Sequence, residues 1–255
     1  MRRLDQRVVI ITGAAGALGR ATALRCADEG AVLCLADRVG AAEVGALLAA
    51  RGARCIDVIT DVTDAAAVDL MVARTLAAFG RVDVLVNIAG ITSQGASDDV
   101  SVAEWQRVLD VNLTSAFLCC KAVLPTMRAQ RHGRIVNMSS ILGKNGGNPR
   151  PWIDPAEQQR AGNVAYGVSK AGLIALTAYL AKENAHHVIT VNAVAPGPIA
   201  TGMTANFPAS LQALIPVGRM GVPEEVADAV AFLAGDQAGF VTGEVLDVNG
   251  GAWVD

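Results

Sequence analysis

The chain has 255 residues, of which 52 % are hydrophobic, and a formal net charge of −3. This length allows one large α/β domain or two small ones, with a sizeable core in either case. The basic residues are scattered, which argues against a nucleic-acid footprint and a polybasic membrane patch. Small molecules and further copies of the chain are therefore the expected partners.

The cysteines and histidines form no pattern typical of a metal site or a disulfide framework. The five cysteines are odd in number, lie in apolar segments and have no CxxC spacing, which predicts buried thiols in a reducing compartment, the cytoplasm. The three histidines lack HExxH or a similar spacing, so no metal is expected.

The N-terminal residues could be mistaken for a signal peptide, because Arg2 and Arg3 precede an apolar run. Asp5 and Arg7 interrupt that approach, and the run is better explained as a strand followed by a glycine turn. Elsewhere, every stretch of about 18 residues contains a charge or a helix breaker, so no membrane span is expected.

Short β-branched runs alternate with helical patterns along the chain. The runs are apolar on both faces, as in parallel strands covered by helices on each side. They predict strands at 7–12, 31–36, 54–59, 82–87, 134–139, 189–195 and 244–248. We therefore expect a single doubly wound α/β domain over residues 1–255, with a seven-stranded, mainly parallel sheet.

The first predicted strand runs into TGAAGALGR, residues 12–20. A glycine turn between a strand and a helix lets backbone N–H groups meet a pyrophosphate, although glycines also form ordinary tight turns. The next strand ends at Asp37, 18 residues after Gly19, close to the spacing at which a carboxylate reaches the ribose of an adenine dinucleotide. Such a carboxylate repels a 2′-phosphate and favours NAD over NADP, a preference that the neighbouring Arg38 would weaken.

Two further helices carry start signals, and one region breaks the alternation. Ser101 and Glu104 have capping-box spacing, and Pro223 followed by two glutamates opens a later helix. Residues 141–165 contain three prolines and four glycines in 25 residues. A structureless connection of that length is uncommon in a compact domain and is more often functional than accidental.

Tyr166 and Lys170 stand four positions apart at the start of a long helical pattern. Taken alone, such a pair is usually an ordinary surface feature. An ammonium about 4 Å from a phenol would contribute on the order of 4 kcal/mol, which is roughly three pKa units. The spacing therefore allows Tyr166 to have a pKa near 7, where a general acid/base works best.

These motifs resemble those of the classical short-chain dehydrogenase/reductase family, and the likeness covers essentially the whole chain. Residues 12–19 match its TGxxxGxG loop and residues 87–90 its NNAG turn. The resemblance implies a Rossmann-type fold, an NAD(P)-dependent oxidoreductase, and a catalytic tetrad of Asn112, Ser140, Tyr166 and Lys170. It also implies a set of cofactor-binding residues, which are Thr12, Gly13, Ala15, Leu18, Gly19, Asp37, Arg38, Asp61, Val62, Asn87, Ala89, Gly90, Tyr166, Lys170, Pro196, Gly197, Ile199 and Thr201.

Three positions depart from the family pattern. Ala17 stands where the middle glycine of the loop is usual, which should weaken cofactor contact modestly. Ile88 replaces the second asparagine of the NNAG turn, so one local hydrogen bond is in doubt. Ser140 and Tyr166 are 26 residues apart instead of about a dozen in the family, and the excess is the irregular region.

In the mechanism that the resemblance implies, Tyr166 transfers the hydroxyl proton of an alcohol while hydride passes to the nicotinamide. Ser140 would hydrogen-bond the same oxygen, and Lys170 would lower the pKa of the phenol and hold the nicotinamide ribose. Asn112 would hold a water that relays protons from Lys170. Ser139 is a rival for the serine role, and Ser140 is preferred as the second serine of the NxSS pattern.

The expected function is NAD-dependent interconversion of a secondary alcohol and a ketone on a small polar substrate, such as a sugar, polyol or hydroxy acid. A 3-oxoacyl-thioester reductase is the alternative, against which Asp37 argues because most such reductases use NADPH. A non-catalytic sensor of dinucleotides is an alternative of another class, and the complete tetrad argues against it. The family commonly forms homotetramers through two long helices starting near Ser101 and Gly162 and through the C-terminal strand.

The segment 143–164 joins Ser140 to Tyr166, so it must pass over or beside the substrate cleft. Its three prolines restrict the backbone and favour an ordered segment. We expect a semi-rigid wall or lid that narrows substrate choice, with Trp152 and Arg150 facing a polar or anionic substrate. The alternative is a surface excursion or subunit contact that never touches substrate.

Overall fold

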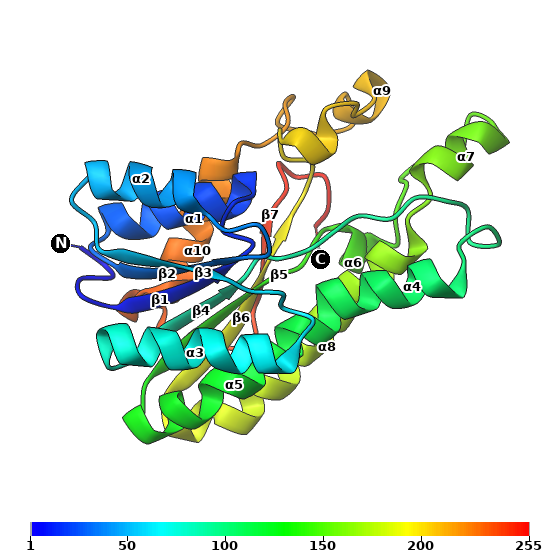
Figure 1. Ribbon diagram of the computed structural model, residues 1–255. Helices are drawn as coiled ribbons and strands as arrows, with labels where there is room; N and C mark the ends of the chain where they lie inside the picture. The colour runs from blue at the N-terminus through cyan, green and yellow to red at the C-terminus, as the bar shows by residue number, and fades with distance from the viewer. Residues whose placement is uncertain (1, 255) are drawn as a thin grey trace.

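The computed structural model describes residues 2–254. Their strands form one seven-stranded sheet in the order β3-β2-β1-β4-β5-β6-β7, and every pairing in it is parallel (Figure 1). Each strand lies within two residues of its predicted bounds, so the doubly wound sheet is confirmed, with fully parallel pairing. The strands are β1 (Val8–Thr12), β2 (Val32–Asp37), β3 (Cys55–Ile59), β4 (Val84–Asn87), β5 (Gly133–Met138), β6 (Ile189–Pro196) and β7 (Val245–Val248).

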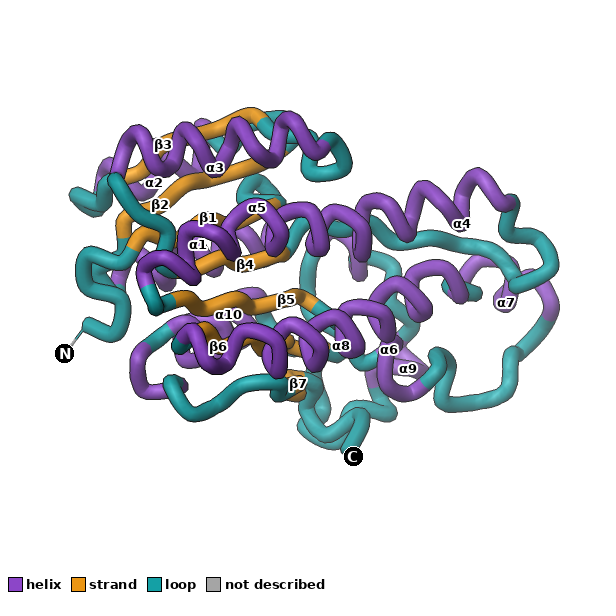
Figure 2. The backbone as a smooth tube through the Cα atoms, turned by 90° about the horizontal axis from the view of Figure 1, so that it is seen from below, coloured by secondary structure: helices purple, strands orange, loops and turns teal. Residues whose placement is uncertain are grey.

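Helices cover both faces of the sheet because successive strand residues point to opposite sides. In β1, Val9 and Ile11 enter one core cluster and Ile10 enters the other. The first face carries α1 (Ala17–Asp28), α2 (Ala42–Ala50) and α10 (Pro223–Ala234). The second face, turned toward the viewer in Figure 2, carries α3 (Ala65–Phe79), α5 (Ser115–Gln130) and α8 (Val164–Asn184).

Shorter elements extend the molecule beyond the carboxyl ends of the strands (Figure 1). They are α4 (Val102–Leu109), the π-helix Asp110–Thr114, α6 (Leu142–Asn145), α7 (Pro155–Ala161) and α9 (Ala209–Gln212). Single 3₁₀ turns span Ala185–His187, Gly202–Thr204 and Asp236–Ala238. The region 141–165 is thus partly helical, as expected for an ordered segment, although its sequence pattern did not predict these short helices.

Only half of the predicted capping box at the start of α4 forms. The Ser101 hydroxyl accepts a hydrogen bond from the Glu104 backbone N–H at 3.1 Å. The Glu104 carboxylate does not turn back to Ser101 but pairs with the Arg107 guanidinium at 2.7 Å. The guanidinium of Arg107, one helical turn later, instead donates two hydrogen bonds to the carboxylate, at 2.7 and 2.8 Å.

Two helical runs, Val102–Gln130 and Val164–His187, are long and apolar enough to cross a membrane by length and composition alone. Within each run, α5 and α8 pack apolar residues against the sheet. This core packing accounts for a large part of their hydropathy.

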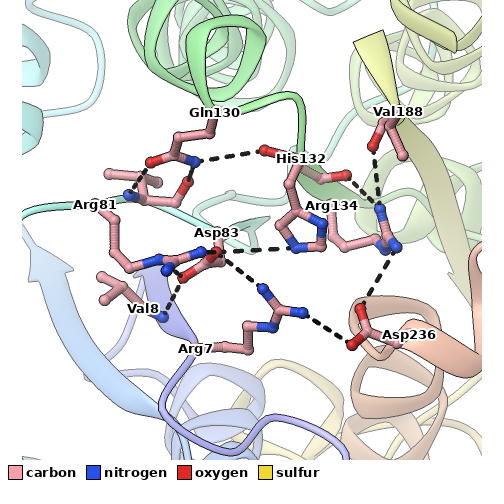
Figure 3. Close-up of polar contacts among 11 residues, drawn as sticks. Arg7, Val8, Arg81, Asp83, Gln130, His132, Arg134, Val188 and Asp236 are labelled. Atoms are coloured by element: carbon pink, nitrogen blue, oxygen red, sulfur yellow. Dashed lines mark hydrogen bonds and ion pairs between the residues drawn. The ribbon is translucent and has the colours of Figure 1, made fainter. Parts of the chain in front are cut away.

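Charged side chains gather at the amino ends of the strands (Figure 3). We call this group the Asp83 cluster; it consists of Arg7, Arg81, Asp83, His132, Arg134 and Asp236. The fully buried Asp83 carboxylate accepts from the Val8 backbone N–H at 2.9 Å, from Arg81 at 2.6 and 2.8 Å, and from Arg7 at 3.4 Å. Several donors therefore compensate this buried charge and tie the starts of β1 and β4 together.

Candidate active site

The glycine turn after β1 packs directly against the turn after β4. Gly13 has a φ of +68°, and a Cβ there would lie 2.9 Å from the Ala89 Cα. The Thr12 hydroxyl accepts from the backbone N–H groups of Ile88 and Ala89 at 3.1 and 3.2 Å. The structure thus brings the two predicted cofactor-binding turns together, and Ile88 takes part through its backbone.

The start of α1 has the properties of an anion site. Its N-cap residue Gly16 makes no side-chain capping bond, and Ala15, Gly16 and Ala17 are exposed. A Cβ at Gly19 would collide with the Gly13 carbonyl oxygen, so glycine is required where the helix starts against the turn. The methyl group of Ala17 lies at the exposed surface, so this departure from the family pattern leaves the helix end open to a pyrophosphate.

Asp37 lies beside this turn at the end of β2. Its carboxylate accepts from the Ala15 N–H at 3.0 Å and from the Val39 N–H at 3.2 Å, which fixes it near the expected ribose position. Two hydrogen bonds from Thr63 lower the pKa of Asp61, and the nearby Arg38 charge adds a smaller contribution. Arg38 is exposed and close enough to interact with Asp61, next to the buried Val62.

Lys170 is the buried charge of the site. It is 4 % exposed, and its Nζ donates to the Met138 carbonyl oxygen at 2.7 Å. The same Nζ lies 5.5 Å from the centroid of the Tyr166 ring. Burial lowers the pKa of Lys170 to about 8, since desolvation disfavours the charged ammonium.

The pKa of Tyr166 moves opposite to the sequence-based expectation. Burial raises the pKa of the phenol, and a hydrogen bond with Ser140 offsets only part of this effect. The expected value near 7 assumed a fully charged ammonium about 4 Å away in a solvated setting. The structure instead buries Lys170 fully and Tyr166 partly, and for Tyr166 desolvation outweighs the opposing effect of Ser140.

The two candidate serines have different surroundings. The Ser139 hydroxyl is buried and donates to the Lys170 backbone carbonyl oxygen at 2.8 Å, so it fastens α8 to the end of β5. The Ser140 hydroxyl accepts from the Leu142 N–H at 3.2 Å and lies close enough to the Tyr166 phenol to lower its pKa. This geometry favours Ser140 as the partner of the phenol, which strand alternation alone could not decide.

Asn112 lies in the π-helix and holds the turn after β4. Its Oδ1 accepts from the Ile91 N–H at 2.8 Å, and its Nδ2 donates to the Ile91 carbonyl oxygen at 2.9 Å. Nδ2 also donates to the Ser169 hydroxyl at 2.9 Å, a contact that sequence reasoning missed. A Cβ at Gly90 would lie 3.3 Å from Asn112 Oδ1 and 3.4 Å from Lys170 Nζ, so these groups enclose the ammonium.

The remaining predicted cofactor residues lie at the same edge of the sheet. Asn87 ends β4, and its Nδ2 donates to the Asn137 side chain of β5 at 2.9 Å. The segment Pro196 to Thr201 follows β6, where a Cβ at Gly197 would lie 2.9 Å from the Asn249 Cα. Ile199 is buried and its backbone pairs with Gly221. Thr201 caps the 3₁₀ turn that follows.

Residues 143–164 form an ordered segment that we call the insertion. Glu157 organises it, accepting from the Arg150 guanidinium at 2.6 and 3.1 Å and from the Ile153 N–H at 2.6 Å. Arg150 is therefore engaged inside the insertion, a pairing that the seven-residue separation did not suggest. Trp152 is half-buried.

The insertion is fastened at both of its ends. Lys144 pairs with Asp247 of β7 at 2.7 Å. At the other end, Asn163 bridges Gly95, and Gln159 donates to Asp99 at 3.3 Å. The insertion thus connects the edge of the sheet to the loop that follows β4.

The chain is similar to known proteins along nearly its whole length. A family model described as enoyl-(acyl carrier protein) reductase matches residues 13–252. A 3-oxoacyl-[acyl-carrier-protein] reductase from Synechocystis is 43 % identical, with 98 % of each chain covered. A cis-4-hydroxycyclohexanecarboxylate dehydrogenase from Sinomonas cyclohexanicum is 42 % identical, with 96 % of each chain covered.

A third relative, the BbsD subunit of (2S)-[(R)-hydroxy(phenyl)methyl]succinyl-CoA dehydrogenase from Thauera aromatica, is 41 % identical, with 97 % of each chain covered. A solved short-chain dehydrogenase/reductase from Burkholderia xenovorans superposes with a TM-score of 0.90 at 38 % identity over 100 % of both chains. The chain therefore belongs to the short-chain dehydrogenase/reductase family of oxidoreductases.

Proposed function

We propose that the protein interconverts a secondary alcohol and a ketone with NAD(H). The convergence of Ser140, Tyr166 and Lys170 carries this proposal: the phenol lies close enough to the serine for its pKa to be lowered, and it lies beside a buried ammonium. Such a constellation supplies an acid/base group, a hydrogen-bond donor for the reacting oxygen, and a nearby cation.

In the proposed mechanism, Tyr166 takes the proton from the alcohol oxygen, or returns it in the reverse direction. The Ser140 hydroxyl hydrogen-bonds the same oxygen as its charge develops. When bound, the nicotinamide supplies the hydride acceptor and, in its oxidised form, a positive charge. That charge and the Lys170 ammonium both favour the phenolate, opposing the effect of burial on the pKa of Tyr166. Asn112 positions the turn that adjoins Lys170, and it remains our candidate to hold a relay water.

The residues proposed to hold the cofactor fit a dinucleotide. The open start of α1 would hold the pyrophosphate, Asp37 would accept from the adenosine ribose, and Asp61 with Val62 would contact the adenine. Thr12, Gly13, Leu18, Ala89, Gly90 and the segment from Pro196 to Thr201 line the remainder of the proposed site.

We propose NAD over NADP because the Asp37 carboxylate is fixed by two backbone N–H groups beside the glycine turn. We expect kcat/KM to be at least tenfold higher with NAD. Replacing Asp37 by Ser should narrow this gap at least threefold, with Arg38 then free to meet a phosphate. Steady-state measurement of kcat/KM with NAD and with NADP tests this expectation. The variant Asp57→Ser, which removes a carboxylate from the neighbouring strand β3, is the control. Equal use of both cofactors by the unmodified protein contradicts the assignment.

We propose that the substrate is a small polar alcohol, a class that includes sugars, polyols and hydroxy acids, and that within this class it is a hydroxy acid. One relative is named for a hydroxycyclohexanecarboxylate, which supports this choice. A 3-oxoacyl thioester is the second candidate, and it is supported by relatives named for acyl-carrier-protein and coenzyme A thioesters.

A panel distinguishes the two substrate candidates. It consists of 3-hydroxybutyrate, cis-4-hydroxycyclohexanecarboxylate, sorbitol and 3-hydroxybutyryl-CoA, each measured with NAD and with NADP by absorbance of the reduced cofactor. Highest kcat/KM on a free hydroxy acid supports the first candidate. Highest kcat/KM on the thioester favours the second.

We also propose a cytoplasmic homotetramer formed through α4, α5, α8 and the C-terminal strand. Tyr179 is 78 % exposed on α8, and Phe117 on α5 and Val168 on α8 are also exposed. These apolar side chains would be covered by a second copy. Sedimentation velocity measures the assembly, and a monomer at micromolar concentration would contradict it.

The insertion is proposed to wall the substrate cleft. Because Glu157 neutralises Arg150, this proposal depends on the half-buried Trp152 more than on a free cation. Trp152→Ala should change KM at least fivefold for some members of the panel, while NADH affinity stays within twofold. The exposed neighbour Ile153 gives a matched control as Ile153→Ala. Unchanged kinetics in Trp152→Ala, Arg150→Ala and a shortened insertion would refute the wall.

A further inference from the structure

Ser169 connects the catalytic helix to the turn that adjoins Lys170. Its side chain is fully buried, and its hydroxyl donates to the Tyr166 backbone carbonyl oxygen at 2.7 Å. The same hydroxyl accepts from Asn112 Nδ2 at 2.9 Å. One oxygen therefore joins α8, on the backbone of the catalytic tyrosine, to the π-helix.

Asn112 extends this connection to a third element. Its amide grips both the N–H and the carbonyl oxygen of Ile91, at 2.8 and 2.9 Å. The preceding residue, Gly90, is packed so closely that an added Cβ would lie 3.4 Å from Lys170 Nζ. A continuous path of buried and part-buried hydrogen bonds thus runs from Tyr166 through Ser169 and Asn112 to the wall around the ammonium.

We propose that Ser169 is a positioning residue: its hydroxyl sets the distance between α8 and the turn at Gly90 and Ile91, and thereby the surroundings of Tyr166 and Lys170. Without it, Asn112 Nδ2 keeps one acceptor, the Ile91 carbonyl oxygen, and no other hydrogen bond within residues 2–254 joins that amide to the catalytic helix. The turn can then move away from Lys170 and admit water. This inference rests on the proposed oxidoreductase function of the same site.

Thr177 provides an internal control on the same helix. It is equally buried, its hydroxyl donates to the Leu173 backbone carbonyl oxygen at 2.7 Å, and it accepts from Asn137 Nδ2 at 2.9 Å. Ser169 and Thr177 thus make the same pair of bonds, to their own helix and to a buried asparagine amide. They differ in what that asparagine holds: Asn137 accepts from the Asn87 side chain of the neighbouring strand, whereas Asn112 binds the turn beside Lys170.

The test compares Ser169→Ala with Thr177→Val, using the best alcohol of the panel and NAD. Both variants should lower the melting temperature by a few degrees, because each leaves a buried amide short of an acceptor. For Ser169→Ala we expect kcat to fall about tenfold or more, with the KM for alcohol within threefold and the rise of kcat/KM with pH moved to lower pH. The shift follows because water admitted beside Tyr166 and Lys170 relieves the desolvation that raises the pKa of the phenol. For Thr177→Val we expect kcat within twofold and an unchanged pH profile.

Hydrogen exchange gives a readout that does not depend on activity. The Ile91 N–H, held by Asn112 Oδ1, should exchange at least tenfold faster in Ser169→Ala and be unchanged in Thr177→Val. Should Ser169→Ala not fold, Ser169→Cys keeps the buried volume with weaker hydrogen bonds, and the same changes are expected in smaller measure. Equal effects of the Ser169 and Thr177 variants on exchange at Ile91, or equal effects on kcat, overturn the positioning role. A wild-type protein that is inactive on the whole panel refutes the proposed function instead, and exchange at Ile91 then decides this inference alone.

Discussion

The two ends of the sheet bury charge in opposite ways. At the amino ends, the Asp83 carboxylate is fully buried but receives hydrogen bonds from Arg7, Arg81 and the Val8 backbone (Figure 3). At the carboxyl ends, the equally buried Lys170 ammonium donates to the Met138 carbonyl oxygen, and no carboxylate within residues 2–254 forms an ion pair with it.

This difference separates a structural charge from a functional one. A compensated buried charge stabilises its surroundings once formed, and removal of one partner is strongly destabilising. An uncompensated buried charge weakens the fold and shifts its own pKa, which is tolerated where chemistry needs it. The same sheet therefore carries a structural cluster at one end and the proposed site of proton transfer at the other.

Removal of the Tyr166 phenol tests the functional end of the sheet most directly. Tyr166→Phe should reduce kcat at least a thousandfold, since general acid/base catalysis contributes roughly 10² to 10⁴ and the oriented phenol has no substitute. NADH affinity, measured by fluorescence titration, should stay within threefold. A variant that keeps more than a tenth of the wild-type activity would end the proposed role of Tyr166.

At the other end of the sheet, Asp83→Asn should lower the free energy of unfolding by about 3 kcal/mol, because the arginines lose their buried partner. Denaturant titration measures the loss. The folded fraction should keep kcat within twofold, as the cluster lies away from the site. A large fall in kcat without a loss of stability would show that the two ends are coupled.

Lys170→Met should have effects opposite to those of Asp83→Asn, with a large loss of activity and a gain in stability. We expect kcat to fall at least a hundredfold, while stability near pH 7 rises by about 1 kcal/mol as an uncompensated buried charge is removed. Since burial lowers the pKa of Lys170 to about 8, below its unfolded value, the wild type gains stability as the pH rises from about 8 toward 10. Lys170→Met should lose that gain. A Lys170→Met variant that is markedly less stable than the wild type would contradict the comparison.

The sequence was sufficient for what depends on local pattern. The strands are continuous apolar runs, the glycine turn is fixed by Gly13 and Gly19, and Tyr166 and Lys170 share a helix face through their spacing alone. The prediction of the short-chain dehydrogenase/reductase family, made from these motifs, is confirmed by the comparisons.

What the sequence could not provide depends on contacts between distant segments. From the sequence alone, each member of the Asp83 cluster would be interpreted as a solvated surface charge, because the charges meet only when the strands pair. The direction of the Tyr166 pKa follows from burial by surrounding elements, which no spacing reveals. Arg150 looked free because its partner Glu157 lies across a turn of the insertion. For Ser169, the only indication in the sequence of a role in the site was its position directly before Lys170.

Transfer of deuterium from substrate to cofactor tests the central claim most directly. The protein is incubated with NAD and each alcohol of the panel, deuterated at its carbinol carbon, and the NADH formed is analysed by mass spectrometry. The account predicts singly deuterated NADH from at least one substrate with the wild type, and at least a thousandfold slower formation with Tyr166→Phe. Wild-type protein that binds NADH but transfers no deuterium from any alcohol would contradict it and favour a dinucleotide sensor.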